Sequence, residues 1–202
     1  MHGRCRLVTP IIENKSLHLA SSSPRRREIL EALGLGFSVG AADVDEQRLD
    51  GEPAGDMVLR LARDKARAGS PGDDFVVVGA DTAVVLGDDI FGKPVDQVDA
   101  LEMLARLSGT THQVLTGVAV WAGQRMRASL SVTDVRFREI SPDEARAYWQ
   151  SGEPADKAGA YAIQGKGGVF VKEITGSYSC VVGLPVFETV SLLKEAGVRV
   201  LG

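Results

Sequence analysis

The chain has 202 residues, of which 44% are hydrophobic and 25% charged, so it has enough apolar material for a buried core and is not expected to be disordered. Its formal net charge of −4 argues against a general polyanion-binding protein, although local basic groups could still hold a small anionic ligand. Its two cysteines, Cys5 and Cys180, lie far apart in the sequence, which favours a reduced, cytoplasmic protein over a disulfide framework or a zinc knuckle.

Residues 1–16 carry basic groups and a short apolar patch that Pro10 interrupts. Neither a long apolar run nor a small-residue cleavage site follows, so a signal peptide is not expected. No segment of the chain approaches the length of a membrane span. We therefore interpret residues 1–16 as a flexible extension and Leu17 as the start of the fold.

The first half of the chain alternates short apolar strand patterns with helical patterns, each bounded by serine, proline or glycine. The expected elements are a strand over Leu17–Ala20, a helix from Pro24 to Gly34, a helix over Asp56–Ala68, a buried strand over Phe75–Ala80 that ends at Asp81-Thr82, and a hairpin over Ala83–Phe91.

The second half contains two long adjacent strands and several helix signals. The expected elements are a helix over Asp96–Leu107, strands over His112–Trp121 and Met126–Phe137, a capping-box helix from Ser141 to about Gln150, a glycine-rich loop over Asp156–Gly168, a short strand over Val169–Val171, a further loop at Ser177–Ser179, and a helix over Pro185–Ala196. Interspersed helices and strands around an antiparallel pair predict a mixed α/β fold, and the glycine-rich stretches predict two lobes with a cleft.

The segment Ser21–Arg27 runs from a strand through three serines into the start of a helix. The first amides of a helix have no internal partner, so this terminus suits an anion, and the forked donors of Arg25 and Arg26 match phosphate oxygens. A capped surface helix with solvated arginines is an equally good reading of the segment taken alone. Two later lysines, Lys65 and Lys93, are either phosphate ligands or solvated side chains.

Asp81 follows the buried strand directly, at a position where ligand groups gather in α/β folds. A carboxylate there could hold a divalent cation or orient a water, but an ordinary turn aspartate is the better reading of this residue alone. Asp43, Asp45 and Glu46 form a small acidic cluster that is either part of a metal shell or only a loop.

The stretch Asp156–Gly165 is too apolar for a plain linker and too glycine-rich for a helix. Loops of this kind allow the backbone to approach a ligand closely. The amide of Gln164 both donates and accepts hydrogen bonds, which suits the edge of a base. A loop that packs on the core is the alternative.

The combination and order of these motifs are more specific than any one of them. Ser-x-Ser-Pro-Arg-Arg, Gly-Ala-Asp-Thr, Gly-Lys-Pro, Leu-Ser-Gly-x-x-His and Asp-Lys-Ala-Gly-Ala-Tyr-x-Ile-Gln-Gly follow one another along the chain. Together they resemble the Maf family of nucleotide pyrophosphatases, most closely the branch that acts on dTTP and UTP. The resemblance runs from about Leu17 to the last helix.

The resemblance implies hydrolysis of a nucleoside triphosphate to the monophosphate and pyrophosphate, with Mg²⁺ or Mn²⁺ as cofactor, in the housecleaning of nucleotide pools. It implies a fold similar to the inosine triphosphatase group, with a long mixed central sheet flanked by helices, and residues 17–202 as one two-lobed domain. Members of the family are often homodimers. Two departures are the extension over residues 1–16 and Ala162, where glycine is commoner.

The resemblance also assigns roles to residues. It makes Asp81 the proton acceptor. We further hypothesise that Asp81 holds the divalent cation, with Asp45 or Glu46 as additional ligands. The remaining assignments are Ser21, Arg26, Lys65 and Lys93 for the phosphates, with Lys65 and Lys93 also catalytic, and Arg25, Thr82 and Gln164 for substrate choice.

Three other functions remain open at this stage. One is a pyrophosphatase for modified purine nucleotides, and another is a non-catalytic nucleotide-binding regulator of cell division and septum formation. Intact Asp81, Lys65 and Lys93 argue against a regulator without catalysis. DNA binding is the weakest, because the chain is acidic and lacks a DNA-reading motif.

Overall fold

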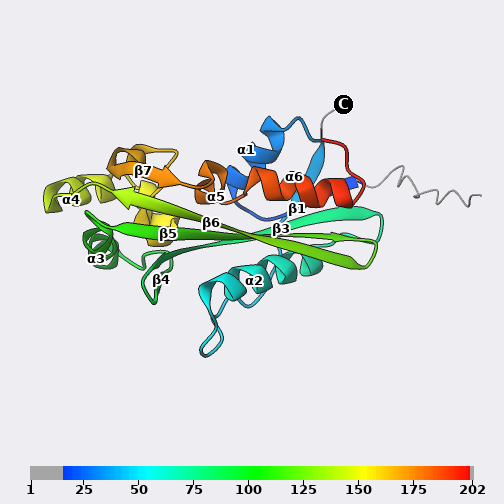
Figure 1. Ribbon diagram of the computed structural model, residues 1–202, viewed down its shortest axis with the longest axis horizontal. Helices are drawn as coiled ribbons and strands as arrows, with labels where there is room; N and C mark the ends of the chain where they lie inside the picture. The colour runs from blue at the N-terminus through cyan, green and yellow to red at the C-terminus, as the bar shows by residue number, and fades with distance from the viewer. Residues whose placement is uncertain (1–15, 201–202) are drawn as a thin grey trace, which may run out of the picture.

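The computed structural model describes residues 16–200, which form a seven-stranded mixed sheet with helices packed against both faces (Figure 1). The strand order is β2-β1-β3-β5-β6-β7, and β4 pairs with β3 beside this path. Strand β1 (Ser16–Ala20) is parallel to β2 (Phe37–Gly40) and to β3 (Phe75–Leu86), whereas β3 is antiparallel to β4 (Asp89–Phe91). The predicted mixed α/β fold is confirmed. The expected extension lies outside the described residues, apart from Ser16, which begins β1.

The centre of the sheet is antiparallel and is made by β3 with two long strands, β5 (Thr111–Ala122) and β6 (Arg125–Phe137). The turn between β5 and β6 places Gly123 at φ 53° and Gln124 at φ 64°, the left-handed conformation that tight hairpin turns use. Strand β7 (Val171–Thr175) extends the sheet beside β6. These long strands form the floor on which the helices pack.

Helix α2 (Ala54–Ala68) covers one face of the sheet and lies unusually close to it. A Cβ atom at Gly79 would lie 2.3 Å from the carbonyl oxygen of Ala62, and one at Gly117 would lie 2.4 Å from that of Val58. These two positions therefore need glycine. The close packing brings the α2 side chain Lys65, which is buried, against the middle of β3.

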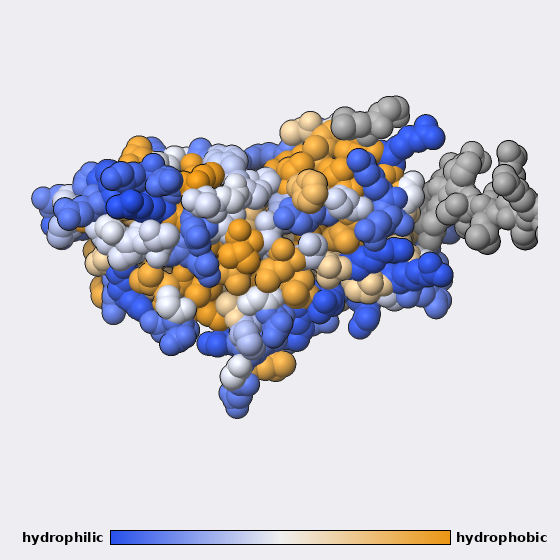
Figure 2. All heavy atoms as spheres, in the orientation of Figure 1, coloured by the Kyte–Doolittle hydropathy of each residue, from blue (hydrophilic) through white to orange (hydrophobic). Residues whose placement is uncertain are grey.

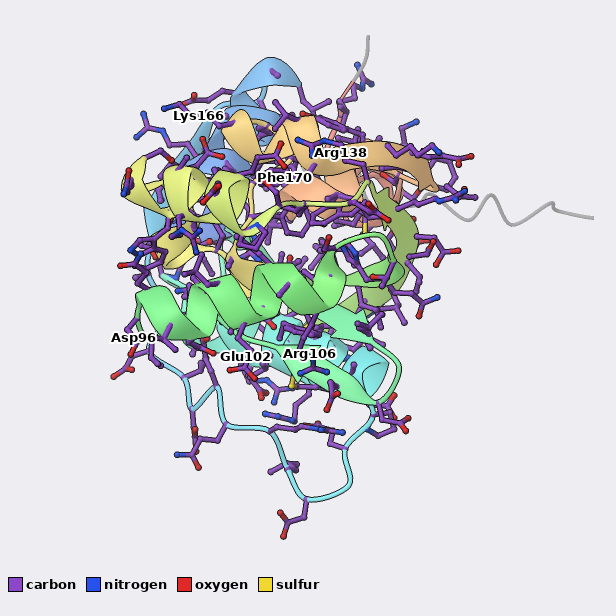
Figure 3. All side chains as sticks on the ribbon, turned by 90° about the vertical axis from the view of Figure 1, so that its left-hand side faces the viewer. Asp96, Glu102, Arg106, Arg138, Lys166 and Phe170 are labelled. Atoms are coloured by element: carbon purple, nitrogen blue, oxygen red, sulfur yellow. The ribbon has the colours of Figure 1, made fainter. Side chains whose placement is uncertain are left out.

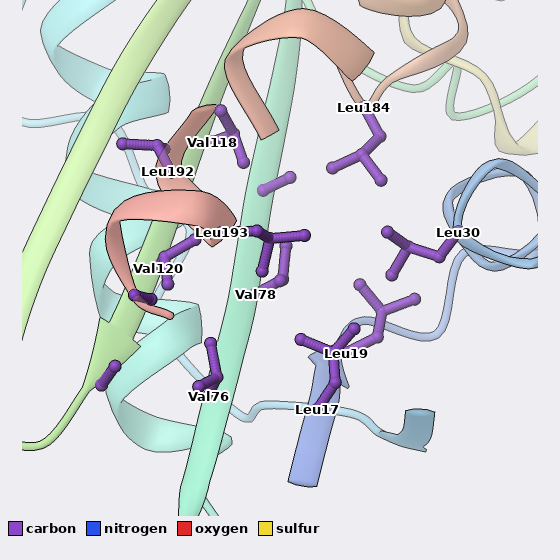
Figure 4. Close-up of a cluster of buried hydrophobic side chains, with 13 residues drawn as sticks. Leu17, Leu19, Leu30, Val76, Val78, Val118, Val120, Leu184, Leu192 and Leu193 are labelled. Carbon is purple, nitrogen blue, oxygen red and sulfur yellow. The ribbon is translucent and has the colours of Figure 1, made fainter. Parts of the chain in front are cut away.

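The opposite face carries α1 (Pro24–Ala32), α5 (Tyr178–Val182) and α6 (Val186–Glu195). Leucine and valine side chains from β1, β3 and β5 meet residues of α1 and α6 in a buried apolar cluster (Figure 4). On the face shown in Figure 2, apolar side chains also reach the surface over α6. Phe187, a residue of this helix, is 80% exposed.

A second buried cluster lies at the other end of the sheet, beneath α3 (Gln97–Leu107) and α4 (Pro142–Gln150). The side chain of Asp96 caps α3, and Ser141 and Glu144 form the predicted capping box of α4. Figure 3 views this end, with Asp96 at the start of α3 and Arg106 towards its end. Three short 3₁₀ turns complete it: η1 (Glu153–Asp156), η2 (Ala158–Ala160) and η3 (Lys166–Phe170).

Several boundaries differ from the sequence-based predictions. Strand β3 does not end at Asp81 but continues to Leu86, because β5 pairs with it along its whole polar stretch. The predicted glycine-rich loop over residues 156–168 contains η2 and the start of η3, and the expected strand at 169–171 begins only at Val171. Ser177 caps α5 where a loop was predicted, and β2 was not predicted. The expected division into two lobes stays a prediction. None of the helices within residues 16–200 is long and apolar enough to cross a membrane.

Candidate functional site

A cavity of about 500 Å³ lies at one edge of β3, in a gap between two strands. Strand β1 pairs with this edge at residues 75–78, and β4 pairs with it at residues 84–86. Residues 79–83 of this edge pair with neither strand. The loops that follow β1 and β4 therefore meet around an open stretch of β3, and they line the cavity together with residues of α2 and η2.

Most of the residues that the sequence singled out line this one cavity. They are Ser21, Arg25, Arg26, Glu46, Lys65, Asp81, Thr82, Lys93 and Gln164. Asp45 is not among the lining residues, and its Oδ1 atom accepts a hydrogen bond of 2.9 Å from the backbone amide of Gln47. The fold thus brings together side chains from distant parts of the chain.

Asp81 and its neighbour Thr82 point to opposite faces of the sheet, as adjacent strand residues must. Asp81 lies on the α2 face, where its Oδ1 atom accepts a hydrogen bond of 2.7 Å from Lys65 Nζ. Thr82 lies on the α1 face, where its hydroxyl contacts Arg26. Both line the cavity, because neither β1 nor β4 pairs with this part of the β3 edge.

Lys65 lies between two carboxylates. Its Nζ atom is 2.7 Å from Asp81 Oδ1 and 2.7 Å from Glu46 Oε1. The Lys65 and Asp81 side chains are only 10% and 13% exposed, so the interaction is weakly screened by water. Burial acts to raise the pKa of Glu46, but the hydrogen bond and charge of Lys65 outweigh it, so this pKa is lowered and the carboxylate stays ionised.

Carboxylates are the protein ligands that a divalent cation would use in this cavity. Among residues 16–200, no three His, Cys, Asp or Glu side chains lie close enough together to hold a metal ion by themselves. Asp81 and Glu46 still offer hard oxygen donors around one ammonium group. Mg²⁺ commonly takes one or two carboxylates and completes its shell with phosphate oxygens and water. The donor set fits a cation that binds together with a triphosphate.

Arg26 is fixed by three separate parts of the chain. Its Nε atom donates to the carbonyl oxygen of Gly183 at 2.8 Å, and its terminal nitrogens donate to Ser21 Oγ at 3.3 Å and Thr82 Oγ1 at 3.2 Å. Burial lowers the pKa of Arg26, and the negative charge of Asp81 acts against that shift. The guanidinium is thus held in place before any ligand arrives.

The Thr82 hydroxyl belongs to a chain of hydrogen bonds that ends on the backbone. Thr116 Oγ1 donates to the carbonyl oxygen of Cys180 at 2.8 Å, and it lies 3.0 Å from Thr82 Oγ1. Because the Thr116 proton is used on Cys180, Thr82 donates to Thr116 and accepts from Arg26. In this arrangement Thr82 orients Arg26.

The start of α1 keeps the features expected of an anion site. Ser23 occupies the N-cap position without a side-chain cap, and the first turn contains no acidic residue. Ser21 Oγ instead accepts from the Ser23 amide at 3.2 Å, which closes the serine loop. The helix begins at the cavity, since Pro24 and Arg25 both line it.

Gln164 is exposed and comes from the far side of the cavity, in a turn closed by a hydrogen bond of 3.3 Å from the Gly165 amide to the Ala162 carbonyl. The same segment faces α1 through Asp156, whose Oδ2 atom lies 3.8 Å from Arg25 Nη1. The cavity therefore has a cationic and carboxylate side at β3 and an amide-bearing side at the 156–164 segment.

Sequence reasoning missed two contributors to the site. Lys157 lines the cavity, its side chain is only 15% exposed, and it pairs with Asp156. A lysine within an apolar, glycine-rich stretch was the signal that could have identified it. Thr116 is fully buried between Val114 and Val118 on the same face of β5, and a buried polar side chain between two valines indicates a specific partner.

Comparison with known proteins gives relatives over nearly the whole chain. The family model described as Maf-like protein matches residues 16–196. The dTTP/UTP pyrophosphatase of Hahella chejuensis is 55% identical over 190 residues, covering 92% of this chain and 94% of that protein. That of Anaeromyxobacter dehalogenans (strain 2CP-C) is 55% identical over 188 residues, covering 90% of this chain and 94% of that protein. That of Methylococcus capsulatus is 52% identical over 187 residues, covering 92% of this chain and 93% of that protein.

Proposed function

The chain belongs to the Maf family, and from this premise we propose that it hydrolyses dTTP and UTP to the nucleoside monophosphate and pyrophosphate. The observation that carries the proposal is the cavity at the open edge of β3, which brings together a fixed arginine, a paired carboxylate and an amide-bearing turn. Relatives named for this activity, with identities of 52–55%, support the choice of substrate. Modified pyrimidine triphosphates are included, as housecleaning of nucleotide pools would require.

In the proposed mechanism the phosphates lie against the start of α1. The unpaired amides of the first turn and the Ser21 hydroxyl donate to phosphate oxygens, and the forked guanidinium of Arg26 offsets their charge. Lys93 is exposed at the cavity and would neutralise the leaving pyrophosphate. The reaction is mainly positioning and electrostatic stabilisation, so a preorganised arginine is the kind of group that it needs.

Asp81 is the proposed proton acceptor for the attacking water. Its Oδ1 atom is engaged by Lys65, and no donor among the described residues contacts Oδ2. This second oxygen is free to orient a water and take its proton. Lys65 fixes the carboxylate and separates it from Glu46, so its proposed role includes holding Asp81 as well as offsetting phosphate charge.

Mg²⁺ or Mn²⁺ is the proposed cofactor, held by Asp81 and Glu46 together with the substrate phosphates. When bound, the cation would offset negative charge on the phosphate oxygens. Asp45 would have to release the Gln47 amide before it could contribute a ligand. Thr82 and Arg25 would act on substrate choice with Gln164, Thr82 through Arg26 and Gln164 through the base edge.

The deciding experiment is pyrophosphate release by the full chain from a panel of triphosphates, with and without Mg²⁺ or Mn²⁺. We expect pyrophosphate from dTTP and UTP only with metal, and a loss of about a hundredfold or more in kcat for Asp81→Asn. Asp88→Asn, at an exposed turn outside the cavity, is the matched control and should retain activity. Near-normal turnover by Asp81→Asn would disprove its role, and a preference for modified purines would replace the proposed substrate class.

A homodimer in the cytoplasm is part of the same proposal. Light scattering after size-exclusion chromatography measures the mass directly and should give twice the 21.5 kDa of one chain. A mass of one chain at enzyme concentrations that sustain full activity would contradict the dimer.

A further inference from the structure

Two side chains that have no role in the proposed mechanism bind the backbone of the turn that carries Gln164. Tyr148, near the end of α4, donates its hydroxyl to Glu153 Oε1 at 2.7 Å and accepts the Ala162 amide at 3.0 Å. Glu153, at the start of η1, accepts the Lys166 amide on Oε2 at 2.9 Å and the Gly167 amide on Oε1 at 3.0 Å. Backbone amides on both sides of Gln164 are therefore bound to one Tyr–Glu pair.

The glycines of this segment fit around the pair. A Cβ atom at Gly165 would lie 2.3 Å from Glu153 Oε2, and one at Gly167 would lie 2.5 Å from the Tyr148 hydroxyl. Any other residue at either position would push the pair away from the turn. We call the Tyr148–Glu153 pair the clamp. The clamp explains the Gly-Lys-Gly sequence after Gln164 better than the turn alone does, since neither glycine has a positive φ.

The surroundings keep the Tyr148 hydroxyl protonated and the Glu153 carboxylate ionised. Tyr148 is 5% exposed, and its ring packs edge-on against Phe170 with centroids 5.1 Å apart. Burial and then the hydrogen bond to Glu153 raise the pKa of Tyr148, so it remains a donor. Burial acts to raise the pKa of Glu153, but the amides of Gly167 and Lys166 outweigh it, so the net shift is downward and the carboxylate remains an acceptor.

We infer that Tyr148 and Glu153 are positioning residues that fix the Ala162–Gly167 turn, so that Gln164 presents its amide to the base at one defined place in the cavity. The inference rests on the proposed function for the identity of the ligand. Neither residue lines the cavity, and both act through the backbone of the turn. A mobile Gln164 would still meet many bases but would distinguish them poorly, because discrimination requires a donor and an acceptor in fixed positions.

The test compares Tyr148→Phe and Glu153→Gln with the exposed controls Tyr178→Phe and Glu173→Gln, using the full chain. Residue-specific hydrogen exchange reads the clamp without any activity. We expect faster exchange at Ala162 in Tyr148→Phe and at Lys166 and Gly167 in Glu153→Gln, with both controls like the wild type. Unchanged exchange in both clamp variants would overturn the inference.

The functional readout is the ratio of dissociation constants for CTP and UTP, with Gln164→Ala as the benchmark for a lost base contact. Both clamp variants should lose about tenfold in this ratio, the size expected for one hydrogen bond, and KM for UTP should rise with little change in kcat. Faster exchange with an unchanged ratio would make the pair a purely structural one and would also overturn the inference. Failure of the proposed function is separate, since it would be seen as nucleotide binding without pyrophosphate release by the wild type.

Discussion

At the scale of single residues, two neighbours on β3 divide the site between the faces of the sheet. Asp81 meets Lys65 on the α2 face, and Thr82 meets Arg26 on the α1 face. A one-residue shift of the strand would turn Asp81 to the α1 face and Thr82 to the α2 face, and the Asp81–Lys65 contact would be lost. The register of β3, which β5 fixes along the same stretch, is therefore part of the chemistry of the site.

His112 is a residue for which the structure predicts a pH effect. It is 1% exposed, its Nε2 atom is 2.9 Å from the Tyr161 hydroxyl, and burial lowers its pKa to about 4. The unfolded chain takes up a proton on this histidine below its ordinary pKa of 6.5, whereas the folded chain does so only near 4. Its contribution to stability is thus complete above pH 6.5 and is lost as the pH falls towards 4.

The loss attributable to His112 should be about 2 kcal/mol between pH 7 and pH 5, measured as the free energy of unfolding in urea. In His112→Gln the absolute stability will be lower, but the same drop in pH should cost about 2 kcal/mol less than in the wild type. Identical pH dependence of the two proteins would show that His112 is not held neutral by burial.

At the scale of elements, the closeness of α2 to the sheet decides where Lys65 lies. Gly79→Ala would place a methyl group 2.3 Å from the Ala62 carbonyl oxygen, so α2 must shift away from β3. We expect a loss of about 1–3 kcal/mol in stability and a fall in kcat, because Lys65 then leaves Asp81. Denaturant unfolding and pyrophosphate release measure the two effects.

Gly36→Ala is the matched control for this substitution, because, chain neighbours aside, no atom of residues 16–200 lies within 4 Å of the added Cβ and the φ of Gly36 is not positive. This control should leave the free energy of unfolding and kcat near their wild-type values. Full stability and activity of Gly79→Ala would show that α2 does not pack tightly against β3 at this position.

At the scale of the whole molecule, the site has the opposite charge from the chain. The net charge is −4, but the cavity is lined by five lysines and arginines against three carboxylates. A triphosphate is thus repelled by the protein as a whole and attracted by the cavity. We expect kcat/KM for UTP to fall several-fold as NaCl rises from about 0.05 to 0.5 M, because salt screens exposed charges.

The Lys93→Gln variant should start from a lower kcat/KM and depend less steeply on salt, since Lys93 is an exposed cation of the cavity. Circular dichroism at each salt concentration checks that the fold is unchanged. A kcat/KM that does not vary with ionic strength would contradict attraction by the cavity.

Much of this molecule could be predicted from its sequence where the signal is local. The periodicity of α2, the long β5–β6 pair and the Ser141 capping box were all recognisable, and they are confirmed. The strand β3 was predicted to end at Asp81-Thr82 because two polar residues interrupt an apolar run. It continues because those side chains find Lys65 and Thr116, partners that no local pattern reveals.

The same distinction applies to the site. The family resemblance identified eight of the residues that line the cavity. It did not reveal the Tyr148–Glu153 pair, because the partners of that pair belong to the backbone of a distant turn. Ser177 caps α5 through a hydrogen bond of 3.2 Å from the Cys180 amide, and a serine next to Tyr178 resembled a loop. Contacts to backbone atoms leave little trace in a single sequence.

The segments that surround the gap in the β3 edge are far apart in the sequence, and this has a consequence for the order of folding. Strands β5 and β6 are joined by a tight turn and can pair early, because their contacts are local in sequence. The parallel pairing of β1 with β3 and the docking of the 156–164 segment join distant parts of the chain and must follow. During refolding, sheet structure should therefore return before the chain can bind a nucleotide, and a nascent protein would carry its central hairpin well before it becomes an enzyme.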